Sequence, residues 1–205
     1  SYLGERQEKG LETDFLDTEA DAAPAPGAKA QATFIADKAK LIAGIGSANE
    51  WGFTETKTFD ASWRKMSARD GIVWLDGVFK PIDDHFAAYA CCYVEVAQEM
   101  DARLAVGSDD DHKIWLDRRE VGQRATSQAV TPGAFKYDVH LTPGVHRILL
   151  KVVDRTNDCG FTLAVTDRAD EAIPGLKAFI DPRGKKLVLD AQKAAAYSPE
   201  RLTRE

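Results

Sequence analysis

Long apolar runs and an excess of positive charge are both missing from this sequence of 205 residues. The longest apolar stretches resemble Arg147–Val153, which is short and interrupted by a charged side chain, so none is long enough to cross a bilayer. The net charge is -6, and lysine and arginine form no cluster of the kind that displaces counterions from phosphates. We therefore expect no membrane span and no nucleic-acid partner.

Catalytic sequence motifs are missing as well. The chain has no nucleophile elbow, no zinc-binding helix motif and no phosphate-binding loop. Gly44 and Gly46 suggest a dinucleotide loop, but Asn49 stands where that motif needs its third glycine. The run Asp83–His85 combines carboxylates with an imidazole, although a solvated turn explains it more simply. The other histidines, His112, His140 and His146, are scattered. We predict that the protein is not an enzyme.

Cysteine is scarce, with three residues in the chain. Cys91 and Cys92 lie on a predicted strand, where adjacent side chains point to opposite faces, so one internal disulfide at most can form. A Cys92–Cys159 bridge is conceivable, but buried free thiols are the favoured interpretation. The vicinal pair also lacks the spacer that lets two sulfurs reach one metal ion.

The stretch Arg103–Val121 carries the clearest structural signal. Leu104 and Val106 alternate with other residues, the polar segment Gly107–Asp111 follows, and apolar residues resume at Ile114–Leu116. This order predicts a strand, an exposed acidic corner and a second strand. The corner offers oxygen ligands that suit Ca²⁺ and acceptors that suit hydroxyl groups, whereas local bonds to backbone amides are the simpler explanation.

Short segments with a two-residue period recur on both sides of this stretch. They are 72–74 and 78–79, which flank the hairpin-type pair Asp76–Gly77, and then 89–98, 135–141, 145–153 and 161–165. Short strands joined by turn residues, with hardly any helical periodicity, predict a mainly β fold, an antiparallel jelly-roll β-sandwich. In each strand, alternate apolar residues lie on the same face of the sheet, and we predict that this face is buried. The predicted core residues are Val94, Val96, Leu104, Val106, Ile148, Leu150, Phe161 and Leu163.

Composition divides the chain into three parts. Residues 1–32 are an acidic arm with a small-residue, proline-containing linker, residues 33–167 form the sandwich with the best support at 71–167, and residues 168–205 are an extension. Within the extension, 178–180 and 187–189 flank turn residues and predict a hairpin. We expect both ends to be ordered by contacts outside the sandwich, on a second chain or domain. The sequence begins with Ser1 and not with methionine, so we expect the chain to be a processed product or an excised piece.

Aromatic residues gather ahead of the best-supported part of the sandwich, at Trp51, Phe53, Phe59 and Trp63. We expect them to cap one end of the β core, with a sugar-stacking platform as the alternative.

The run from Gly71 to Asp167 resembles the jelly-roll modules that accompany glycoside hydrolases, and those modules are related in shape to galactose-binding-like and protective-antigen-type domains. The resemblance is carried by six short pieces in order, namely Tyr89-Ala90, Gly107-Ser108-Asp109-Asp110, Trp115-Leu116, Pro143-Gly144, Ile148-Leu149-Leu150-Lys151-Val152 and Gly160-Phe161. It implies a noncatalytic carbohydrate-binding accessory module in an extracellular, periplasmic or cell-envelope protein. The alternative is a structural or assembly subunit that binds a protein partner through its extensions.

A ligand site follows from this resemblance together with the acidic corner. The expected ligand-binding residues are Asp109, Asp110, Asp111, Tyr93, Trp115, Asn157 and Asp158. The first three are also the expected ligands of Ca²⁺. The expected partner is a glycan or a protein chain.

Overall fold

A computed structural model describes residues 10–12, 14, 16, 19, 29–35, 56–63, 65–76, 78, 86–155, 157–183 and 185 of the chain. Within these ranges it contains eleven β-strands. They are β1 (Lys29–Ile35), β2 (Thr56–Ser62), β3 (Val73–Trp74), β4 (Ala87–Val96), β5 (Met100–Asp109), β6 (Asp111–Leu116), β7 (Arg119–Arg124), β8 (Phe135–Leu141), β9 (Gly144–Val153), β10 (Gly160–Thr166) and β11 (Lys177–Phe179). No helix in the described ranges is long and apolar enough to cross a membrane.

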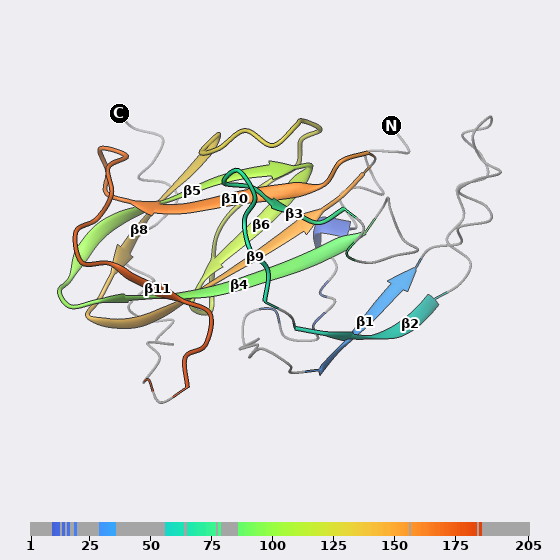
Figure 1. The fold of residues 1–205 in the computed structure, drawn as a ribbon, viewed down its shortest axis with the longest axis horizontal. Coiled ribbons are helices and arrows are strands. Elements are labelled where there is room, and N and C mark those ends of the chain that lie inside the picture. Colours follow the sequence, from blue (N-terminus) through green and yellow to red (C-terminus); the bar gives the residue numbers. More distant parts are fainter. Residues whose placement is uncertain are drawn as a thin grey trace.

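Nine of these strands form a sandwich of two antiparallel sheets (Figure 1). One sheet has the order β3-β10-β5-β8 and the other has the order β11-β4-β9-β6-β7. From β3 to β10 the pairs are nested: β6 pairs with β7, β5 with β8, β4 with β9 and β3 with β10. A long hairpin rolled up in this way is a jelly roll, and the predicted fold class is confirmed.

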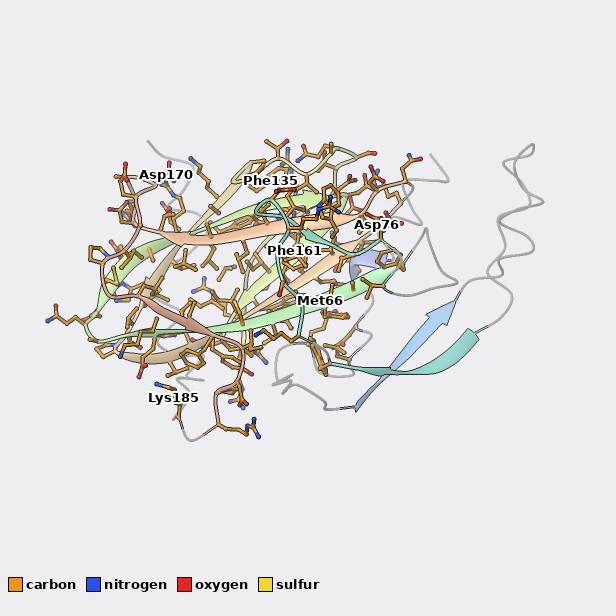
Figure 2. All side chains as sticks on the ribbon, viewed as in Figure 1. Met66, Asp76, Phe135, Phe161, Asp170 and Lys185 are labelled. Atoms are coloured by element: carbon orange, nitrogen blue, oxygen red, sulfur yellow. The ribbon has the colours of Figure 1, made fainter. Side chains whose placement is uncertain are left out.

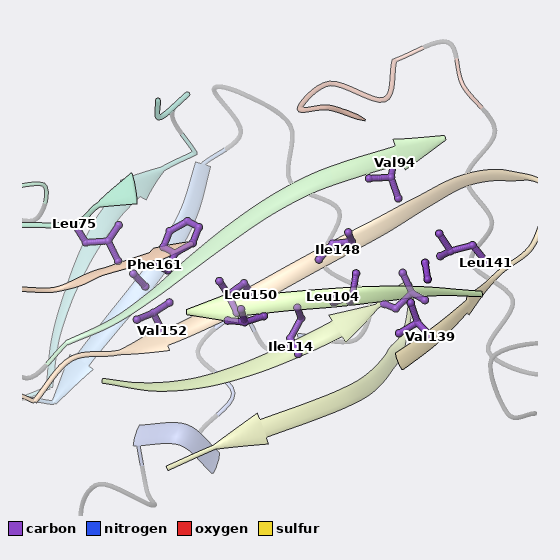
Figure 3. Close-up of a cluster of buried hydrophobic side chains, with 14 of the residues drawn as sticks. Leu75, Val94, Leu104, Ile114, Val139, Leu141, Ile148, Leu150, Val152 and Phe161 are labelled. Carbon is purple, nitrogen blue, oxygen red and sulfur yellow. The ribbon is translucent and has the colours of Figure 1, made fainter. Parts of the chain in front are cut away.

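The core lies between the two sheets (Figure 3). Alternate side chains of each strand point inward, so Leu104 of β5 and Ile148 of β9 are fully buried. Each buried aliphatic side chain contributes roughly 1.5–3 kcal/mol through the hydrophobic effect. Seven of the eight predicted core residues are buried, and the eighth, Leu163, is partly buried against the same cluster.

The acidic corner connects strands of different sheets. β5 pairs with β8 and β10, whereas β6 pairs with β7 and β9, so the chain crosses from one sheet to the other at Asp110. Thr142 and Pro143 make the same kind of crossing between β8 and β9. The predicted order of strand, corner and strand is therefore confirmed, although the two strands do not pair with each other. The predicted exposure of the corner is wrong, because Ser108, Asp110 and Asp111 are buried.

The prediction of a hairpin around Asp76 is wrong. β3 pairs with Gly160 and Phe161 of β10, and Val78 belongs to a turn in which its amide donates to the carbonyl of Leu75 over 3.1 Å. A hairpin-type turn occurs earlier, at Asp70–Gly71, where both residues have positive φ. Asp70–Gly71 and Asp76–Gly77 carry the same sequence signal for a hairpin turn. The two sites differ only in the pairing of β3 with the distant strand β10, which the signal does not report.

The chain ends also differ from expectation. Lys177–Phe179 does not stand apart as an extension, because β11 pairs with Tyr93–Glu95 of β4 and widens the five-stranded sheet. Residues 187–189, the other half of the predicted hairpin, lie outside the described residues. Near the N-terminus, β1 and β2 form a separate two-stranded sheet. Trp51 and Phe53 lie outside the described residues.

Candidate functional site

The acidic corner brings together four carboxylates from three parts of the chain. Burial raises the pKa of Asp109, the negative charges of Asp110, Asp158 and Asp76 raise it as well, and together they bring it to about 6. Asp76 was not predicted, because it reaches the corner through the pairing of β3 with β10, and its Oδ1 accepts a 2.8 Å bond from the amide of Cys159. Figure 2 shows Asp76 at the end of the sandwich away from Asp170.

Two of the three predicted calcium ligands are already engaged. Asp110 is 3% exposed and its Oδ2 accepts a bond from the amide of Arg155. Asp111 is fully buried and accepts bonds from the Arg155 guanidinium and from the amide of Thr126, each over 2.7 Å. Within the described ranges no three His, Cys, Asp or Glu side chains are placed to hold one metal ion. The carboxylates of this corner therefore fit an anchoring role better than a Ca²⁺ site.

Tyr93 and Trp115, two of the predicted ligand-binding residues, are buried, whereas binding a ligand would require them to be exposed. Tyr93 is 0% exposed and stacks on Phe179 of β11 with ring centroids 6.0 Å apart, while Trp115 is 4% exposed. Both lie on the outer face of the five-stranded sheet and away from the corner. Their distance from the corner follows from their partners on β9. Tyr93 pairs with Arg147 and Trp115 pairs with Leu149, whereas Asp111 at the corner pairs with Val153, which is four to six residues further along the strand. At about 3.3 Å per residue, the rings lie roughly 13–20 Å from the corner.

This outer face also buries cations. Lys151 is 0% exposed, and its Nζ donates to the carbonyl of Leu11 over 2.9 Å and to Glu19 Oε1 over 3.0 Å. Tyr89 donates its hydroxyl proton to the same carboxylate. Leu11 and Glu19 of the N-terminal arm therefore contact the sandwich of their own chain, which corrects for these residues the expectation that contacts outside the sandwich order the arm.

A chain of polar groups runs through the core. The Ser108 hydroxyl donates to the carbonyl of Asp110, His112 Nδ1 lies 2.7 Å from Ser108 Oγ, and His112 Nε2 lies 2.7 Å from the hydroxyl of Tyr137. Burial lowers the pKa of His112, the positive charge of Arg124 lowers it as well, and together they bring it to about 4. A neutral imidazole fits only if Nδ1–H donates to Ser108 and Nε2 accepts from Tyr137. The serine proton is already committed to a carbonyl, so the group anchors the fold and does not resemble an activated nucleophile.

The three cysteines are free thiols, as predicted. Burial raises the pKa of Cys91 to about 11 and the pKa of Cys92 to about 12. Both thiols therefore remain protonated at neutral pH.

A pocket opens on the side of the sandwich, and we call it the lateral pocket. It exists because the edge strands are short: β3 pairs with two residues of β10, and β11 pairs with three residues of β4. Between them the described strands leave both sheet edges uncovered, and a cavity of about 290 Å³ reaches Phe161 of the core. Sequence reasoning did not find this pocket, because strand alternation does not report how far an edge strand extends.

The lining of the lateral pocket is mostly apolar. Ala90, Cys92 and Leu163 join Phe161 at the inner wall, whereas Met66 and Ile180, which are 39% and 37% exposed, lie at the mouth. Figure 2 labels Met66 and Phe161 on this side of the molecule. Fifteen described residues line the pocket, and among them the single charged side chain is Lys65. This arrangement can bind a ligand with a large apolar surface and one anionic group.

Comparisons of this chain with protein-family models, with curated proteins and with solved structures found no match.

Proposed function

We propose that this protein is a noncatalytic binding module whose ligand enters the lateral pocket. The observation that supports the proposal is the opening between the edges of the two sheets, through which the core residues Phe161 and Leu163 become accessible. Binding sites for small molecules are concave, mostly apolar and largely preformed. A cavity of about 290 Å³ is near the lower end of their usual size.

The lining favours an apolar ligand over a sugar. Sugars need several hydrogen-bond partners, whereas the inner wall presents the side chains of Ala90, Cys92, Phe161 and Leu163. The high pKa of Cys92 keeps its thiol neutral, so the wall carries no charge there. The free energy of binding therefore comes mainly from apolar area removed from water.

A neutral apolar probe tests this function. We expect 1-decanol to bind the parent protein in isothermal titration calorimetry, and we expect Ala90→Leu to weaken that binding at least tenfold, because the larger side chain fills the pocket. Ala164→Leu is the matched control, since Ala164 lies on the same sandwich but is exposed on the outer side of β10. Melting curves of both variants establish that they fold. Equal affinity in the parent and in Ala90→Leu would contradict the proposal.

A second candidate function is carbohydrate binding at the acidic corner, as part of a secreted or cell-envelope protein. It is supported by Asp158, which is exposed beside Asp109 and so presents a carboxylate to which sugar hydroxyls can donate. Titration with a panel of neutral oligosaccharides tests it, with Asp158→Ala as the disruptive variant and Asp170→Ala, at the other end of the sandwich, as the control. Binding that survives Asp158→Ala would exclude this site.

A further inference from the structure

We infer that the natural ligand of the lateral pocket is an alkyl carboxylate, a small amphiphile whose chain lies against Phe161 and Leu163 and whose head group pairs with Lys65. This inference rests on the proposed function and adds the chemical class of the ligand. The contacts that carry it are the apolar inner wall and Lys65, the single charged side chain among the described residues of the lining.

Lys65 differs from Arg69, Arg183 and Lys185, each of which has an ion pair. Arg69 pairs with Asp70, Arg183 pairs with Asp181, and Lys185 lies 2.6 Å from Glu95. Lys65 is exposed and has no ion pair with any described residue. A ligand that fills the pocket therefore finds one positive charge at the rim that no described carboxylate neutralises.

The charge pattern selects a carboxylate head group. A lysine ammonium is a compact point charge, and a single one matches a single negative charge, whereas phosphate sites usually combine several donors. The protein carries a net charge of -6, so a more highly charged anion would meet repulsion from the rest of the surface. A cationic amphiphile would place like charge beside Lys65.

The lining residues favour a flexible, unbranched alkyl chain. The inner wall follows the two sheet edges, and Met66 and Ile180 flank the mouth. Methionine is flexible and adapts to an irregular apolar surface, so it suits a ligand that varies in length. Each methylene buried in the pocket raises affinity by up to about fourfold.

Calorimetry with a matched set of probes tests the inference. In the parent protein we expect decanoate, below its micelle concentration, to bind about tenfold more tightly than 1-decanol, and decylammonium to bind more weakly than either. Affinity should rise from hexanoate to octanoate to decanoate. Lys65→Met keeps an apolar side chain at the rim and should make decanoate and decanol bind alike. Lys177→Met, which removes an exposed lysine of β11 outside the lining, should leave the preference for decanoate unchanged.

The outcomes separate the inference from the function on which it rests. If decanol binds and Ala90→Leu abolishes its binding, but decanoate has no advantage in the parent, the head-group assignment is wrong and the proposed function stands. If decanoate keeps its advantage in Lys65→Met, the assignment to Lys65 is likewise overturned. If no probe binds the parent, the proposed function itself fails.

Discussion

The Nζ atom of Lys151 on β9 lies 3.0 Å from Oε1 of Glu19, a residue 132 positions earlier in the chain. The lysine side chain is 0% exposed and the glutamate side chain is 10% exposed. Burial lowers the pKa of Lys151, and the negative charge of Glu19 opposes that effect. An ammonium buried on the face of a sheet therefore depends on a carboxylate supplied by the N-terminal arm.

Glu19→Gln should destabilise the protein by roughly 3 kcal/mol, because it leaves the buried charge of Lys151 without its counter-charge. Denaturant unfolding measures the change in the free energy of unfolding. Glu12→Gln is the matched control: Glu12 belongs to the same arm and pairs with Lys113 over 3.3 Å, but its side chain is 57% exposed. Its loss should cost less than about 1 kcal/mol. Equal effects of the two substitutions would show that the arm contributes little at Lys151.

The strands of the sandwich were predictable because alternation is a local property. In β4, Val94 and Val96 face the core and Tyr93 faces outward, as the two-residue period requires. The two-residue period does not reveal whether the outward-facing side chains are exposed to solvent. Tyr93 is buried because β11 lies beside it, and Lys151 is buried because Leu11 and Glu19 lie against it, and both contacts join distant parts of the chain.

The candidate site was less predictable for the same reason. The acidic residues at 109–111 were visible as a group in the sequence. Arg155, which binds Asp111, and Asp76, whose charge raises the pKa of Asp109, come close to them only through strand pairing. The lateral pocket depends on the length of two edge strands, which no composition signal reports. Lys65 carries no sequence signal that distinguishes it from any other exposed lysine.

Buried His146 should make the protein less stable at alkaline pH. Burial alone lowers the pKa of His146, but the bond to Asp117 Oδ2 and the bond to the carbonyl of Thr142, each over 2.7 Å, together raise it above 6.5. Below pH 6.5 both folded and unfolded states are protonated and the stabilisation is complete. As pH rises further, the unfolded state loses its proton first, and the stabilisation is lost on approach to the folded-state pKa.

The measurement is the difference in unfolding free energy between the parent and His146→Gln from pH 5 to pH 9. We expect about 3 kcal/mol at the acidic end, since the substitution leaves Asp117 buried without its charged partner, and a smaller difference at the alkaline end. A difference that stays constant with pH would show that His146 is not a buried cation.

His112 should act in the opposite direction. Its pKa is about 4 in the folded protein and 6.5 when unperturbed, so between these values the unfolded state binds more protons and stability falls as the solution is acidified. The full shift corresponds to about 3 kcal/mol. His112→Asn retains a donor near Ser108 and should lose stability at neutral pH, while showing a shallower decline from pH 6.5 to pH 4. Identical slopes for the parent and the variant would refute the assignment.

Gly122 on β7 should not tolerate a side chain. A Cβ atom there would lie 2.0 Å from Cε1 of Tyr137, so the ring would have to move away from His112, to which its hydroxyl is bonded. Gly122→Ala should cost about 3 kcal/mol in unfolding free energy, at the upper end for overpacking, because a hydrogen bond is lost with the packing. The exposed neighbour Gln123 gives the control, and Gln123→Ala should change stability by less than about 0.5 kcal/mol.

Asp109→Asn should stabilise the protein at neutral pH. The pKa of Asp109 is raised from 3.8 to about 6, first by burial and then by the charges of Asp110, Asp158 and Asp76. Between these values the folded state binds more protons than the unfolded state, so stability falls as pH rises from 3.8 to 6. Because Asp109 is partly solvated, we expect the gain from asparagine to be on the order of 1 kcal/mol at pH 7.5, and to vanish near pH 4.

Melting curves of the parent and Asp109→Asn at both pH values measure this gain, and Asp138→Asn is unsuitable as a control because Arg103 pairs with it. Asp158→Asn is the better comparison, since it removes one of the repelling charges, stays exposed and should give a smaller gain of the same sign. Melting curves of the parent and of Asp109→Asn, repeated with Ca²⁺, test the calcium prediction from the sequence.

A ligand that binds only the folded state raises the melting temperature by mass action. A calcium-dependent rise in the parent that Asp109→Asn abolishes would establish a cation site at this corner, and would replace charge repulsion as the explanation of its behaviour.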